Sequence, residues 1–146
     1  MQIQPKDSYH GSALTQIVED PSFTALNKAD EKYGHYLINS NIRLLVKHST
    51  AQNSPWSYTF QPDDLRVLAT DIQTGAKTFA CLICGSKTIC LLNADQIKTI
   101  INLNCSGTQW VRVEIRTSGG SLWVQGQSGE YRKSIPHTAF PLALFE

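Results

Sequence analysis

Three of the four cysteines lie in one stretch, 78-TFACLICGSKTICLLN-93, as Cys81-x-x-Cys84-Gly followed by Cys90. A Cys-x-x-Cys pair followed by glycine has the spacing of one zinc knuckle, and a structural zinc site needs four ligands. The second pair of ligands is missing, because no Cys-x-x-Cys or His-x-x-His motif lies between Cys90 and Cys105. The residues around the motif are apolar, whereas zinc knuckles are usually polar and rich in turns.

These apolar flanks favour a buried β-hairpin. Residues 79–84 and 88–92 are apolar on both faces, as in strands of a sheet that is covered on both sides, with the turn at 85–87. Successive side chains of a strand alternate, so Cys81 and Cys84 point to opposite faces and cannot chelate one ion. We therefore predict buried thiols, with no metal and no cofactor. A small zinc-binding module and a redox pair remain the alternatives.

Basic residues form the second candidate site. The net charge of +1 excludes a strongly basic protein that coats DNA, so any basic surface is local. Between residues 35 and 61 the only charged residues, Arg43 and Lys47, are positive and share one face of a predicted strand. The residues that we predict to contact nucleic acid are Arg43, Lys47, His48, Arg112, Arg116, Arg132 and Lys133. The alternative is a solvated basic face.

Carboxylates and aromatic residues provide weaker signals. Asp63 and Asp64 follow Pro62, and acidic residues in the first turn of a helix are explained by the helix dipole. Glu114 and Arg116 share a strand face, as a solvated ion pair would. Aromatic residues recur at 56, 58 and 60 and at 110 and 123, where we expect mainly core packing, with base stacking as the alternative. We predict no catalytic residue.

The elements around these sites predict a single α+β domain of 146 residues. Its mixed or antiparallel sheet packs against two or three helices, and residues 1–11 form a flexible N-terminal arm. We expect helices over 12–19, 21–33, 62–74 and 94–101. The strands are expected at 36–38, 42–48, 56–60, 79–84, 88–92, 110–116, 121–125 and 130–134.

The compartment is predicted from hydropathy. The opening residues MQIQPKDSYHGS have no apolar region of a secretory signal. No run approaches the roughly 18 apolar residues of a membrane span. We therefore expect a cytoplasmic protein with reduced cysteines and no membrane partner.

The order of elements between residues 20 and 92, helix, three strands, helix and strand, resembles that of the restriction-endonuclease-like fold, PD-(D/E)XK. The resemblance covers about half of the chain and implies a metal-dependent nuclease. In that family, carboxylates on the second and third strands hold a divalent metal ion. The corresponding strands here, 42–48 and 56–60, contain no carboxylate.

The leading prediction is therefore a non-catalytic interaction module that contacts nucleic acid or another protein. The first alternative is a metal-dependent nuclease with its carboxylates elsewhere, for which the candidates are Glu31, Asp63 and Glu114. The second alternative is the zinc-binding module.

Overall fold

The computed structural model describes all residues from Met1 to Glu146 and confirms the α+β class. The larger helices are α1 (Pro5–Val18), α2 (Pro62–Gln73) and α3 (Ala94–Ile100), and the chain ends in the short helices α4 (Ala139–Leu142) and η1 (Ala143–Phe145). The strands are β1 (Leu26–Lys28), β2 (His35–Ile38), β3 (Ile42–Ser49), β4 (Trp56–Phe60), β5 (Lys77–Cys84), β6 (Thr88–Asn93), β7 (Gln109–Ile115), β8 (Leu122–Gly126) and β9 (Gly129–Glu130). No helix combines the length and the apolar character that crossing a membrane requires.

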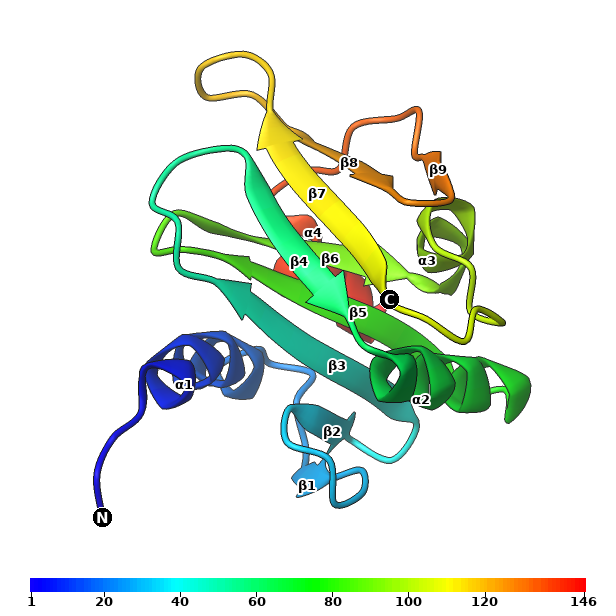
Figure 1. Cartoon of the computed structure of the whole chain (residues 1–146). Coiled ribbons are helices and arrows are strands. Elements are labelled where there is room, and N and C mark those ends of the chain that lie inside the picture. The colour runs from blue at the N-terminus through cyan, green and yellow to red at the C-terminus, as the bar shows by residue number, and fades with distance from the viewer.

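The strands form two sheets. The five-stranded sheet has the order β1-β2-β3-β5-β6 and is antiparallel except for the parallel pair β3 and β5. The four-stranded sheet, β4-β7-β8-β9, is antiparallel throughout. Strand β4 therefore pairs with β7 and does not extend the sheet that contains β2 and β3. In Figure 1, β4 and β7 lie in front of β5 and β6, and α4 lies behind them.

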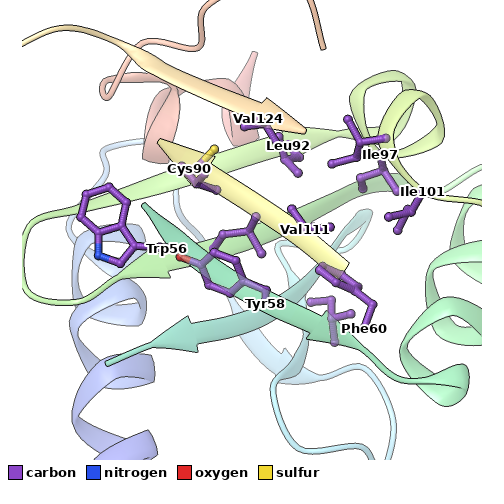
Figure 2. Close-up of a cluster of buried hydrophobic side chains, with 14 of the residues drawn as sticks. Trp56, Tyr58, Phe60, Cys90, Leu92, Ile97, Ile101, Val111 and Val124 are labelled. Atoms are coloured by element: carbon purple, nitrogen blue, oxygen red, sulfur yellow. The ribbon is translucent and has the colours of Figure 1, made fainter. Parts of the chain in front are cut away.

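The larger core lies between the two sheets (Figure 2). The sequence Trp56-Ser-Tyr58-Thr-Phe60 alternates, and its three aromatic side chains are buried while the intervening hydroxyl residues are exposed. These aromatic residues pack with Val111 and Val124 of the four-stranded sheet and with residues of β5, β6, α2 and α3. The predicted core position of these three aromatic residues is confirmed.

A second core covers the opposite face of the five-stranded sheet, where α1, α4 and η1 pack. Strands β5 and β6 are therefore buried on both faces. Cys81 belongs to this second core and Cys84 to the core between the sheets, so their side chains point to opposite faces as predicted. Cys81, Cys84 and Cys90 are free, fully buried thiols, which confirms the buried hairpin.

The starts of α2 and α3 are those that the sequence predicts. In α2, Pro62 occupies the first turn, and Gln61 and Asp64 form a capping box in which Asp64 Oδ2 accepts the Gln61 N–H at 2.8 Å. In α3, Asn93 Oδ1 accepts the Gln96 N–H at 2.9 Å. These caps satisfy backbone N–H groups that have no partner within a helix.

Two predictions for the N-terminal region are wrong. Residues 5–11 of the expected arm are helical, because Pro5 fits the first turn of α1 and Asp7 accepts the Gln4 N–H at 2.9 Å. The helix expected over 21–33 does not form. Asp20 instead accepts the Ser22 N–H at 2.9 Å in a local turn, and the following residues pair as β1 with β2.

Candidate nucleic-acid interface

The outer face of the four-stranded sheet carries a group of aromatic and basic side chains that solvent can reach. Alternation along β7 directs Val111 and Val113 into the core and Trp110 and Arg112 outward, and Trp110 is 43% exposed. Figure 1 shows no helix in front of β4 and β7. We call this surface the open face. Its residues are Ser57, Thr59, Trp110, Arg112, Glu114, Arg116, Trp123 and Gln125.

Strand register determines which of these side chains are neighbours. Glu114 lies opposite Trp123, and Arg112 lies between Ser57 of β4 and Gln125 of β8. Side chains at such cross-strand positions are close enough to contact one another. The face is therefore a flat array of rings, guanidinium groups and hydroxyl or amide groups.

Two arginines give the open face its chemistry. The Arg116 guanidinium lies 4.3 Å from the ring centroid of Trp123, a cation–π geometry, and its Nε is 3.1 Å from Glu114 Oε1. The Arg112 Nε is buried and has no hydrogen-bond partner. Arg112 itself is half-buried, so a ligand on the open face would meet its terminal guanidinium N–H groups and not the buried Nε.

Arg132 and Lys133 follow the edge strand β9 of the same sheet. Both are exposed, and Arg132 Nε lies 3.6 Å from Glu130 Oε1. An ion pair this exposed contributes little and leaves the arginine available to a ligand. Of the predicted contact residues, Arg112 thus lies in β7, Arg116 follows β7 directly, and Arg132 and Lys133 follow β9 of the same sheet.

The other three predicted contact residues lie elsewhere, on β3 of the five-stranded sheet. Lys47 Nζ is 2.8 Å from Asp64 Oδ2, and Arg43 Nη1 is 3.8 Å from Asp71 Oδ1. The His48 ring stacks on Tyr9 with ring centroids 4.8 Å apart. Carboxylates of α2 therefore neutralise much of this patch, and it is not continuous with the open face.

Sequence reasoning missed the buried charges between β2, β3 and α2. Asp64 accepts from Lys47 and Lys32, and Asp71 lies 2.7 Å from Nε2 of His35. Burial alone would raise the pKa of Asp64, but the hydrogen bonds from Lys47, Lys32 and Gln61 lower it. The available signal was the seven-residue spacing of the two aspartates, which places them on one helix face.

The candidate carboxylates of the nuclease alternative each lie beside a basic residue. Glu31 Oε2 is 3.5 Å from Lys28, Asp63 bonds Lys32, and Glu114 bonds Arg116. They come from a loop, from α2 and from β7. No three or more His, Cys, Asp or Glu residues are grouped so that they could hold a metal ion.

No protein-family model, no curated protein and no solved structure matches the chain.

Proposed function

We propose that the protein is a non-catalytic interaction module that binds single-stranded nucleic acid through the open face. The observation that carries this proposal is the arrangement of Arg116 over Trp123, on the same sheet face as Arg112. Aromatic rings stack on exposed bases, and arginines bind phosphates and add cation–π contacts. The same proposal places the protein in the cytoplasm, in keeping with its four free cysteines.

The flat shape and the balance of charge favour a single strand over a duplex. The bases of a single strand are unstacked and can lie on Trp110 and Trp123, whereas those of a duplex are not available for stacking. In this sheet and the residues that follow its strands, the basic residues Arg112, Arg116, Arg132 and Lys133 outnumber Glu114 and Glu130. Few phosphates can be neutralised, so we expect weak, salt-sensitive binding. If about three phosphates are neutralised, a plot of the logarithm of the binding constant against the logarithm of the salt concentration should have a slope of about −2.

The test is fluorescence-anisotropy titration of a labelled single-stranded oligonucleotide of about 12 nucleotides. Trp110→Ala and Arg112→Ala should each weaken binding about tenfold, because one stacked base or one charge-assisted contact is worth roughly 1–3 kcal/mol. Arg66→Ala is the matched control, since Arg66 is an exposed arginine of α2 outside the open face.

Equal affinity of Trp110→Ala, Arg112→Ala and the unsubstituted protein would overturn the proposal. Cleavage of the oligonucleotide in the presence of Mg²⁺ would also overturn it, in favour of a nuclease.

A further inference from the structure

A small polar cavity lies away from the open face, where α1, the loop before β2, β3 and the start of α2 meet. Its volume is about 240 Å³. The side chains that give it chemical character are Lys6, His10, Lys32, Tyr33, Lys47 and His48. Three ammonium groups, two imidazoles, a phenol and the carboxylate of Asp64 thus line one open cavity.

The three lysines of the cavity have N–H donors that no protein group accepts. An ammonium group has three N–H donors. Lys47 donates to Asp64 alone, Lys32 donates to Asp63 and Asp64, and Lys6 pairs with no carboxylate and lies 4.1 Å from the ring centroid of Tyr33. All three ammonium groups can therefore donate further hydrogen bonds to a ligand.

The carboxylates near the cavity are already engaged. Asp64, with a side chain only 5% exposed, accepts from the Gln61 N–H, Lys47 and Lys32. The Asp63 carboxylate forms an ion pair with Lys32, and the Asp63 side chain is half-exposed. Asp7 accepts from Tyr33 Oη at 2.8 Å and from the Gln4 N–H at 2.9 Å. Asp63 and Asp64 orient Lys32, and Asp64 also orients Lys47.

The two imidazoles add hydrogen-bonding groups without adding charge. His10 is 4% exposed, and the centroid of its ring lies 5.9 Å from that of His48. Burial, with help from the positive charges of His48, Lys6 and Lys47, lowers the pKa of His10 to about 4, although Asp7 opposes this. Burial and Lys47 also lower the pKa of His48. Both rings are neutral at pH 7, and the nearby lysines favour a negative ligand.

The surroundings of His10 determine which of its two ring nitrogens a ligand can reach. Nδ1 is buried without a hydrogen-bond partner, beside the glycine at position 34, whose φ is +85°. A Cβ at that glycine would lie 2.9 Å from His10 Cε1. This side of the ring is closed, which leaves Nε2 as the nitrogen that can bond a ligand in the cavity.

We propose that this cavity binds a phosphate group, held by Lys6, Lys32 and Lys47 and by the imidazoles of His10 and His48. Several ammonium donors around a small space match the several oxygens and the negative charge of phosphate. A metal cation is disfavoured by the three ammonium groups. The site is independent of the open face, and it accepts either free phosphate or the phosphate of a nucleotide.

The experiment is a titration of the full chain at pH 7 with inorganic phosphate and separately with adenosine monophosphate, followed by NMR of the histidine ring protons. We expect saturable shifts of the His10 and His48 signals with at least one of the two ligands. A lower dissociation constant for the nucleotide would assign the phosphate to a nucleotide, and equal constants would assign it to the free ion. Absence of shifts with both ligands would overturn the proposal.

Variants link the binding to the cavity. Lys6→Ala should weaken phosphate binding about fivefold or more, and because Lys6 is exposed and unpaired the variant should remain folded. Lys47→Met should weaken it about tenfold, as loss of a charge-assisted contact does. Lys98→Ala on α3 is the control and should bind normally. Equal phosphate affinity of Lys6→Ala and Lys98→Ala would contradict the assignment.

Variants of the open face separate the two proposals. Trp110→Ala and Arg112→Ala should leave the phosphate titration unchanged even if they abolish oligonucleotide binding. Loss of phosphate binding in these two variants would show that phosphate binds on the open face, and it would overturn the cavity site.

Discussion

His35 Nε2 lies 2.7 Å from Asp71 Oδ2, and both side chains are almost completely buried. The contact joins β2 to the last turns of α2 across 36 residues of sequence. Asp30 Oδ1 lies 3.0 Å from the other ring nitrogen without completing a hydrogen bond. Two carboxylates therefore surround one imidazole, an arrangement that stabilises the imidazolium.

The first prediction is that stability falls as pH rises above about 6.5 because His35 loses its proton. Burial would lower the pKa of His35, but the Asp71 and Asp30 carboxylates outweigh burial and raise it. A histidine with a raised folded-state pKa contributes stability that is fully present below the unfolded value of 6.5. That contribution is lost as the pH rises through the pKa that His35 has in the folded protein. Urea unfolding between pH 6 and 9 measures it, and His35→Gln should lack this component of the pH dependence.

The second prediction concerns His10, whose shift has the opposite sign. Its pKa is lowered from 6.5 to about 4, so its stabilising contribution is complete above 6.5 and is lost between pH 6.5 and 4. The shift corresponds to a loss on the order of 3 kcal/mol. Between pH 6.5 and 4, the free energy of unfolding of His10→Phe should depend less on pH than that of the unsubstituted protein. Urea titrations of the two proteins measure this difference. The lowered pKa of Asp64 matters only at more acidic pH, below the ordinary value of 3.8.

An unchanged pH dependence in His10→Phe would show that His10 is not the titrating group. His48 would then be the next candidate, because its pKa is also lowered by burial and by Lys47.

Local sequence signals predicted much of the fold. The alternation at 56–60, Pro62 with the two aspartates that follow it, and the apolar run through Cys81 each specify an element from neighbouring residues alone. At residues 21–33 the same reasoning failed. An acidic residue before proline starts a helix or a turn equally well, and here pairing of β1 with β2 decides between them.

The candidate sites were harder to predict because they depend on pairing between distant residues. Arg112 and Arg116 were identified as basic residues, but nothing local indicates that Arg116 stacks on Trp123. Lys47 was identified for its charge, and its buried partner Asp64 was interpreted only as an acidic residue in the first turn of a helix. Spatial neighbours on separate elements are set by sheet order, which the sequence pattern does not specify.

The third prediction tests the two cores. Leu68 is fully buried between the sheets, and Ile83 is buried against α1 and the C-terminal helices. Leu68→Ala and Ile83→Ala should each lower the free energy of unfolding by about 2–5 kcal/mol, because truncation leaves a cavity. Leu142→Ala, at an exposed leucine, is the control and should change it by less than about 0.5 kcal/mol. Urea denaturation measures these changes in the free energy of unfolding. Changes as small as that of the control would contradict the assigned core positions.

The fourth prediction concerns thiol reactivity. Burial raises the pKa of Cys84 to about 11, although hydrogen bonds from Tyr58 and from the Cys90 backbone oppose the shift, and burial also raises the pKa of Cys81 and Cys90. The thiolate is the reactive form, so these three should react with a thiol reagent only after denaturation. Cys105 is partly exposed and should react in the native protein. Cys105→Ser should abolish the native reaction; rapid native labelling of that variant would show that the β5–β6 hairpin opens.

The fifth prediction is that the Lys47–Asp64 pair stabilises the fold more than a surface ion pair does. Removing one partner of a buried pair costs about 3–5 kcal/mol when the other charge is left alone. Lys32 remains beside Asp64, so we expect Lys47→Met to cost less, about 1–3 kcal/mol. Lys28→Met is the matched control, because the Lys28–Glu31 pair is 68% and 100% exposed, and it should cost less than about 0.5 kcal/mol.

A double-mutant cycle with Asp64→Asn isolates the pairwise contribution. Asp64→Asn removes the charge but keeps an oxygen that can accept the Gln61 N–H, so the helix cap is retained. If the two charges interact directly, Lys47→Met should cost less in the Asp64→Asn background by about 0.5–3 kcal/mol. Equal costs in both backgrounds would mean that Lys47 contributes through packing of its methylene groups over Phe60, whose ring centroid lies 5.2 Å from its Nζ.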